Sequence, residues 1–186
     1  MIIDENLPKF DLPVDFVADD SISGDILNLY SRYPCNIKAG IFILCTGGTV
    51  KATINLSDFI ITRNNFIVLL PDSFIQIHEV SSDARLCIAG FSSEFISRVN
   101  YIETLLDYFS MILNRPVLPL PEEVAQLYQS AYDLLIRAYA LPNTLENKEI
   151  LRAVLTIFFQ GVGELYKRYG VKMSGSITRE RELYQR

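Results

Sequence analysis

The pattern of hydrophobic and polar positions divides the chain into two halves with different periods. Between about residues 25 and 91, short apolar runs alternate with polar positions, and turn residues bound each run. Alternation at period two is typical of strands with one buried face, and closely spaced short strands favour a sandwich or barrel with mostly antiparallel pairing. The predicted strands are Asp25–Tyr30, Ile37–Thr46, Thr49–Asn55, Asp58–Thr62, Phe66–Pro71, Phe74–Val80 and Arg85–Phe91.

The breaks between these runs contain residues suited to turns. Gly47-Gly48 stands between two alternating runs and predicts a tight hairpin. Arg63-Asn64-Asn65 and Ser81-Ser82-Asp83 supply side chains that tolerate left-handed backbone or bond their own backbone.

After Ser92 the apolar period becomes helical. Ser92 and Ser93 predict the cap of a short helix over Ser93–Val99, and Tyr101, Leu105, Phe109 and Ile112 then fall on one helical face. Pro121 followed by two glutamates indicates the first turn of a further helix, since proline needs no N–H there and carboxylates suit the helix dipole. The second half is therefore predicted to be helical.

The last long helix is predicted from Asn143, where Glu146 completes a capping box, to about Arg168. Its apolar residues cover more than one face, so it packs on two sides. One interpretation buries it between the strand layer and the preceding helix; the other places a homodimer contact on one side, and both can hold. The residues assigned to that dimer contact are Leu151, Val154, Leu155, Phe158 and Val162. Gly161 and Gly163 indicate a close helix approach or a bend.

Composition narrows the class of protein. The 186 residues are 49% hydrophobic and 21% charged, which supplies enough apolar material for a core. The N-terminus has no basic and apolar signal pattern, and the apolar runs are too short to span a bilayer, so we expect a cytoplasmic protein with no membrane contact. Three cysteines without a close pair favour reduced thiols. A net charge of −5 disfavours binding to the phosphates of nucleic acids.

Candidate chemistry is sparse. His78 is the one histidine, which excludes metal sites or mechanisms that need two imidazoles, so we predict no metal, no cofactor and no catalytic residue. Gly47-Gly48-Thr49 lacks the phosphate-binding lysine pattern and the dinucleotide fingerprint. Gln76 and His78 share one strand face, opposite Ile75, Ile77 and Glu79, but alternation does not decide which face looks inward.

Five blocks, taken in order, carry a resemblance to a known family. They are Gly40–Val50, Phe66–Pro71, Ile75–Glu79, Ile88–Phe95 and Arg179–Tyr184. Together they resemble the N-terminal regulatory half of AraC-type bacterial transcription factors, in which the strand block is a cupin-type double-stranded barrel. The last block is similar to the lead-in of that family's helix-turn-helix motifs.

The resemblance implies an α+β fold, with an antiparallel cupin-like double-stranded β-barrel followed by a C-terminal helical dimerisation segment. Residues 1–98 would form the barrel sensor domain, residues 99–170 the helical dimerisation segment, and residues 171–186 a linker and the start of a truncated C-terminal helix-turn-helix DNA-binding domain. The chain lacks the paired histidines and the glutamate of catalytic, metal-binding cupins.

The implied function is that of a regulatory domain that senses a small-molecule effector and forms a homodimer, with DNA contacted only through the C-terminal domain that this chain lacks. The effector is not identified by the resemblance. Two alternatives stay open: a metal-free cupin-like enzyme of isomerase type with His78 as general base, and a ligand-free dimerisation module. The polar residues expected to orient a ligand in the barrel are Tyr30, Thr46, Gln76 and His78.

Overall fold

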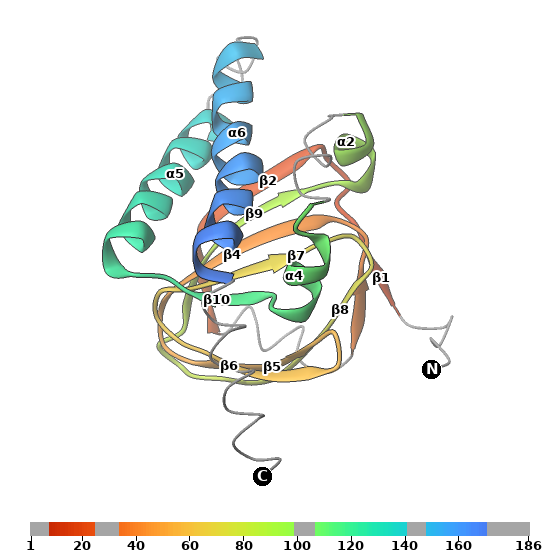
Figure 1. Cartoon of the computed structure of the whole chain (residues 1–186), viewed down its shortest axis with the longest axis vertical. Helices are drawn as coiled ribbons and strands as arrows, with labels where there is room; N and C mark the ends of the chain where they lie inside the picture. Colours follow the sequence, from red (N-terminus) through yellow and green to blue (C-terminus); the bar gives the residue numbers. More distant parts are fainter. Residues whose placement is uncertain (1–7, 25–33, 99–106, 141–147, 171–186) are drawn as a thin grey trace.

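The computed structural model of the chain describes residues 8–24, 34–98, 107–140 and 148–170. Its strands form two five-stranded sheets that face each other, with helices covering one of them (Figure 1). Sheet A contains β1 (Lys9–Phe10), β3 (Cys35–Ile37), β8 (Ser73–Val80), β5 (Val50–Ile54) and β6 (Ser57–Ile61), in that order. Sheet B contains β10 (Val117–Pro119), β7 (Asn65–Leu69), β4 (Gly40–Gly47), β9 (Arg85–Phe91) and β2 (Phe16–Ser23).

Pairing within the sheets is antiparallel, as predicted, except that β1 runs parallel to β3. The two sheets share no strand among the described residues, so the expected closed barrel is corrected to a two-sheet sandwich. The predicted strand Asp25–Tyr30 lies outside the described residues.

The predicted hairpin at Gly47-Gly48 is wrong. β4 pairs with β7 and β9, whereas β5 pairs with β6 and β8, so this dipeptide carries the chain from sheet B to sheet A. Gly48 has a φ of +71°, and a Cβ there would stand 2.4 Å from the Ala84 Cα. The tight hairpin instead lies between β5 and β6, where Asn55 and Leu56 have φ of 49° and 73°. Positive φ at both central residues suits the twist of a two-residue hairpin.

Two strands of sheet B were not predicted. β2 contains Asp19 and Asp20, and its register with β9 shifts between Asp19 and Ile22, which breaks the alternation by which strands are recognised. β10 interrupts the half that was predicted to be helical; it has three residues and pairs with β7 at the edge of the sheet. An edge position tolerates Pro119, which has no N–H to donate.

The helices agree more closely with their predictions. The described helices are α2 (Ser93–Arg98), α4 (Phe109–Asn114), α5 (Glu122–Ala140) and α6 (Lys148–Leu165), and a π-helical turn, η2 (Tyr166–Gly170), follows. The Phe95 N–H donates to the Ser92 Oγ at 3.1 Å, which confirms the predicted cap. Among these described helices, none is long and apolar enough to cross a membrane. The proposed capping box at residues 143–146 lies outside the described residues.

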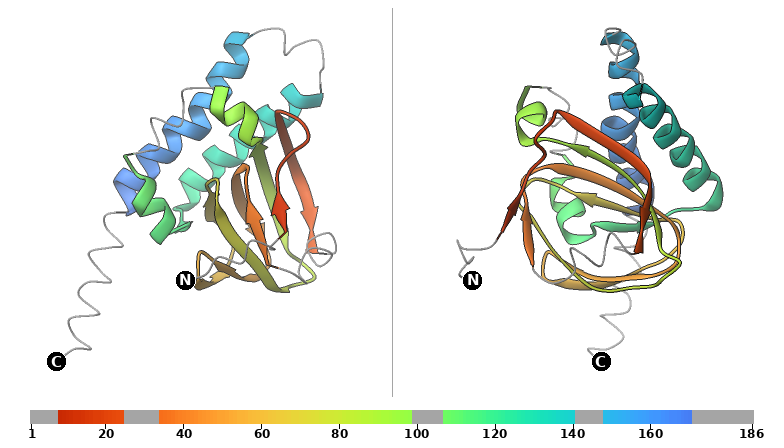
Figure 2. Two further views of the ribbon diagram at one scale, coloured as in Figure 1. Left: turned by 90° about the vertical axis from the view of Figure 1, so that its right-hand side faces the viewer. Right: turned by 180° about the vertical axis from the view of Figure 1, so that it is seen from behind.

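The central strands of sheet B, β7, β4 and β9, are buried on both faces. On β4, Phe42 and Leu44 pack toward the helices, while Ile41, Ile43 and Cys45 face sheet A. The helix-side core is rich in aromatic rings, and the core between the sheets is almost entirely aliphatic. Figure 2 shows α5 and α6 side by side on the same side of the sheets.

Helix α6 packs against the strand layer and the preceding helix α5, as the first of the two interpretations predicted. Leu155, Phe158 and Val162 are buried in the helix-side core of the chain itself. A Cβ at Gly161 would stand 2.6 Å from the Tyr128 Oη of α5, so of the two alternatives, a close helix approach or a bend, the close approach is present at Gly161. The side chains of Leu151 and Val154 are not described.

Tyr132 ties α5 to the centre of sheet B, and its removal provides a test of that contact. Its fully buried hydroxyl donates to the Phe42 carbonyl oxygen at 2.6 Å. We expect Tyr132→Phe to lower the free energy of unfolding by about 1 kcal/mol, because the carbonyl loses a buried donor. Urea denaturation measures the change, with the exposed Gln129→Ala on the same helix as the control. Equal stability of Tyr132→Phe and the native chain would contradict this role.

Candidate ligand-binding cavity

A cavity of about 340 Å³ lies between the two sheets. A smaller space of about 50 Å³ continues toward β5 and β6 and shares Ile43, Ile75, Ile77 and Ile88 with it. The residues that line the larger cavity are Phe10, Leu12, Val17, Ile22, Cys35, Ile37, Ile41, Ile43, Leu69, Ile75, Ile77, Ile88 and Gly90.

Strand alternation explains why this lining is aliphatic. Each strand sends every second side chain into the space between the sheets. The inward positions are Ile75 and Ile77 on β8, and Ile88 and Gly90 on β9. A Cβ at Gly90 would stand 3.1 Å from the Leu12 Cδ1, so the missing side chain leaves room for the N-terminal segment to cross the sheet closely. The result is a wall of branched side chains around an open interior.

The segment 8–15 forms one side of the cavity and is anchored at several points. The Phe10 carbonyl accepts a hydrogen bond from the Lys38 N–H, and the Asp11 carboxylate accepts from the backbone N–H and hydroxyl of Ser93. Asp15 forms an ion pair with Arg98 at 2.6 Å. Burial alone would raise the pKa of Asp11, but the hydrogen bonds from Ser93 and Leu12 lower it overall. These contacts hold Phe10 and Leu12 against the cavity.

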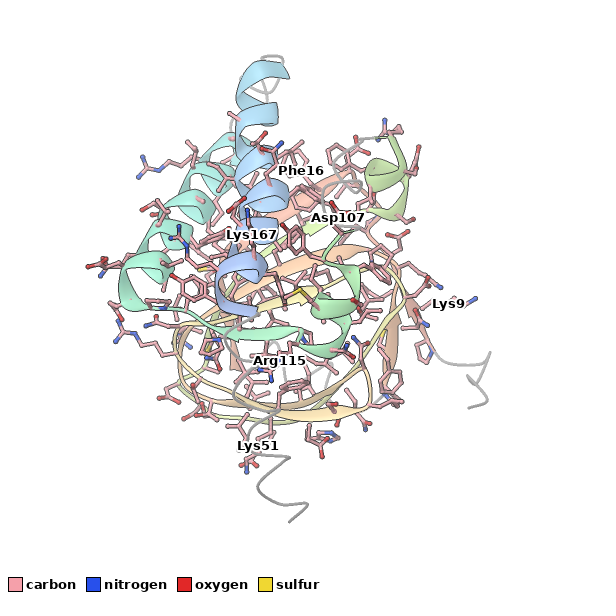
Figure 3. The ribbon with its side chains drawn as sticks, in the orientation of Figure 1. Lys9, Phe16, Lys51, Asp107, Arg115 and Lys167 are labelled. Carbon is pink, nitrogen blue, oxygen red and sulfur yellow. The ribbon has the colours of Figure 1, made fainter. Side chains whose placement is uncertain are left out.

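The polar residues expected to orient a ligand lie elsewhere. Ile75 and Ile77 face inward, so Gln76 and His78 fall on the outer face of sheet A, where Lys51 also projects outward (Figure 3). Thr46 donates its hydroxyl hydrogen to the Arg85 carbonyl at 3.2 Å, near the end of β4. None of these three polar residues lines the cavity, and Tyr30 lies outside the described residues.

His78 belongs to a short hydrogen-bonded chain on that outer face. His78 is exposed and lies at a bulge, where it has no residue opposite it on β5. Its side-chain Nε2 lies 2.6 Å from the Thr53 Oγ1. The Thr53 hydroxyl donates to the Asp58 Oδ1 at 2.6 Å. Because that hydroxyl has one hydrogen, the Nε2 of His78 is the donor to Thr53.

The enzyme alternative needed His78 in a cleft as a general base, and the structure places it on an exposed strand face. Within the described ranges, no group of three histidine, cysteine, aspartate or glutamate side chains is arranged to hold a metal ion. Among the described residues that line the cavity, Cys35 is the one ionisable group, and burial raises the pKa of its thiol.

All three cysteines are free, as the sequence predicted. Burial raises the pKa of the Cys45 thiol, and raises that of Cys87 to about 12 with help from nearby carboxylates. Cys45 and Cys87 are buried, whereas Cys35 is partly exposed on the cavity wall. The reactivity of the Cys35 thiol therefore reports most directly on access to the cavity.

No protein-family model and no curated protein matches the chain. Among solved structures, ToxT from Vibrio cholerae O395 bound to (E)-4-(8-methylnaphthalen-1-yl)but-3-enoic acid matches 84% of this chain and 58% of its own, at 16% identity and a TM-score of 0.45. Unsaturated fatty acid-bound wild-type ToxT from Vibrio cholerae strain SCE256 matches 87% of this chain and 57% of its own, at 13% identity and a TM-score of 0.45. The cupin domain of Schizosaccharomyces pombe Cnp3 matches 48% of this chain and 64% of its own, at 9% identity and a TM-score of 0.33.

The chain therefore spans less than two thirds of the ToxT chains that it matches. ToxT is a regulator of the AraC family, the family that the sequence blocks resemble. Each of these three structural likenesses has a TM-score below 0.5.

Thiol modification tests the placement of the cysteines. With a maleimide at pH 8, we expect Cys35 of the native chain to react at least about tenfold faster than Cys45 and Cys87, because the latter are buried and remain protonated. Mass spectrometry of the digested protein follows each site, and a Cys35→Ser variant should lose the fast phase. Comparable rates at all three sites in the native chain would show that the sandwich is more open than described.

Proposed function

We propose that the chain is the effector-sensing part of an AraC-type transcription regulator, and that the space between its sheets holds the effector. The observation that carries this proposal is the cavity of about 340 Å³. Small-molecule sites in proteins are mostly apolar spaces of roughly 300–1,000 Å³. A space of this size in a sandwich core forgoes packing contacts, and a bound molecule restores them.

The cavity favours a sensor over a ligand-free dimerisation module. The ligand-free alternative requires an interior filled by the chain's own side chains. The sensor interpretation had expected several convergent polar groups, and the described lining is apolar instead. We therefore propose an effector that is itself largely apolar.

Sheet B offers a direct route from the effector to the helices. Ile41, Ile43 and Ile88 line the cavity on one face of β4 and β9. On the opposite face of β4, Phe42 packs edge-to-face on Phe159 of α6 with ring centroids 5.3 Å apart. A ligand that displaces the isoleucines therefore acts on strands that also carry the helical layer, and shifts the population of its arrangements.

The proposed response to the effector is a change in a homodimer formed by the helical layer. Leu127 and Leu134 are seven residues apart on α5 and are 67% and 47% exposed, and Ile157 of α6 is 38% exposed. Residues seven apart lie on one helix face, so the two leucines form an apolar strip that a second copy can cover. DNA contact is assigned to a further domain, since a net charge of −5 does not suit phosphate binding.

Ligand-dependent stabilisation tests the sensing role. We expect apolar molecules that fill the cavity to raise the melting temperature by about 5–10 °C at a hundredfold excess over their Kd, because they bind the folded chain alone. Differential scanning fluorimetry measures the shift. The variant Ile88→Phe, which adds bulk to the cavity wall, should abolish it. An equal shift in Ile88→Phe would place the binding site elsewhere.

Introducing charge into the apolar strip tests the dimer. We expect Leu127→Glu combined with Leu134→Glu to weaken self-association by at least about tenfold, because each glutamate would have to be desolvated in the contact. Sedimentation equilibrium measures the dissociation constant. Gln126→Glu, an exposed change on the same helix, serves as the control. Unchanged association of the double variant would remove this strip from the dimer.

A further inference from the structure

The strand β6 forms an open edge of sheet A. Among the described residues, β5 is its one strand neighbour. Ser57, Asp58 and Ile60 of β6 are exposed, and the exposed fraction of Ile60 is 65%. Figure 1 shows β5 and β6 at the bottom of the view, with α5 and α6 above them. The edge is therefore a different surface from the apolar strip on α5.

Strand geometry shows which backbone groups point out of this edge. The two-residue hairpin before β6 closes with Ile54 opposite Ser57. The pair that closes such a hairpin exchanges both of its backbone hydrogen bonds, and bonded and non-bonded pairs then alternate along the two strands. Asp58 and Ile60 fall in the non-bonded pairs. Their N–H and C=O groups therefore point away from β5.

The side chains of β6 leave this edge accessible to another strand. Edges are commonly protected by charged side chains, prolines or bulges. β6 contains no proline, and its pairing with β5 has no shift of register. Asp58 is its one charged residue, and the Asp58 Oδ1 accepts the Thr53 hydroxyl at 2.6 Å, which holds the carboxylate toward β5. Ile60 places an apolar side chain beside the outward backbone groups.

A second copy of β6 matches this edge in one register. Opposite residues of two antiparallel strands lie on the same face of the sheet, so Asp58 can face Asp58, Ile60 or Thr62 of the other copy. The first choice brings two carboxylates together. The last is poor because the Thr62 N–H and C=O already bond Asn65, at 2.9 and 3.1 Å. With Asp58 opposite Ile60, the outward groups of both residues form hydrogen bonds in both copies.

The charges on the outer face of sheet A agree with this register. On β5, Lys51 lies opposite Ile60 and Thr53 lies opposite Asp58. In the paired sheet, Asp58 therefore faces Ile60 of the second copy and, one strand farther, Lys51 of that copy. The charge nearest to each Asp58 along its row across the contact is thus a positive one.

We propose that β6 pairs antiparallel with β6 of a second copy, with Asp58 of each copy opposite Ile60 of the other, so that sheet A continues across two molecules. The contact uses the same surface on both copies, as a two-fold interface requires. Two strands of this length form a small interface, which is typical of weak association. The pairing is separate from the helical dimer proposed above, and a chain that uses both two-fold interfaces assembles beyond a dimer.

The test uses the whole chain carrying Leu127→Glu and Leu134→Glu, in which the strip on α5 is disabled. We expect sedimentation equilibrium to show that this double variant still self-associates, with a Kd below about 1 mM. A further change, Ile60→Glu or Ile60→Lys, places a negative or a positive charge opposite Asp58 of the other copy. We expect the Kd with Ile60→Glu to be at least about tenfold higher than with Ile60→Lys.

Impaired folding would give the opposite order. Within one copy, residue 60 lies opposite Lys51, so Ile60→Lys brings two like charges together and Ile60→Glu brings opposite charges together. A loss of folded protein would therefore reduce association more in Ile60→Lys. Thermal unfolding of both variants measures this internal effect separately.

The outcomes separate the interface from its register. If the double variant is monomeric up to about 1 mM, β6 is not an interface between copies. If Ile60→Glu and Ile60→Lys weaken association equally, the register with Asp58 opposite Ile60 is wrong. Association that Ile60→Glu weakens and Ile60→Lys retains supports the pairing, whether or not the helical dimer forms.

Discussion

The structure depends on one constraint, which is that the central strands of sheet B, β7, β4 and β9, have no face in water. The inward face of sheet B closes the cavity together with sheet A, and its other face carries α5 and α6. A sheet buried twice must be apolar at nearly every position, and β4 meets this requirement with the unbroken run Gly40–Cys45. Sheet A is buried once, so its outer face keeps polar residues such as Lys51 and Glu79, which form an ion pair at 2.9 Å.

The two faces of sheet B are filled by different kinds of side chain. Toward the helices, Phe42, Phe91, Tyr132 and Phe158 interlock, and the rings of Tyr132 and Phe158 meet edge-on with centroids 5.0 Å apart. Flat rings in such contacts fill space densely and hold a fixed geometry. Toward sheet A the branched aliphatic side chains leave a gap. A rigid interface and an open space thus lie one strand layer apart, which is the arrangement that an effector-driven change in the helices requires.

The N-terminal segment completes the cavity without belonging to either sheet over most of its length. β1 extends sheet A at its edge, and Asp11 and Asp15 then reach α2 at the end of β9. This segment therefore links sheet A to α2, the helix that follows β9 of sheet B. Its two lining residues, Phe10 and Leu12, are held by contacts that lie outside the cavity itself.

The sequence by itself determined the local features, because period and capping are properties of neighbouring residues. The alternation of Phe74–Ile77, the serine cap at Ser92 and the proline start of α5 appear in the structure as predicted, whereas the bulge at His78 places Glu79 on the outer face. Gly161, which destabilises a helix relative to alanine, indicated either a close helix approach or a bend, and the structure shows the close approach to Tyr128 of α5.

Only the tertiary structure decided which strands pair and which face looks inward. The alternation at Ile75 and Gln76 is the same for either orientation, and the core across the sandwich selects the isoleucine. Gly47-Gly48 has the composition of a hairpin, yet its strands join different sheets because their partners come from distant parts of the chain. The cavity arises where the two sheets meet, and no local pattern records such a contact.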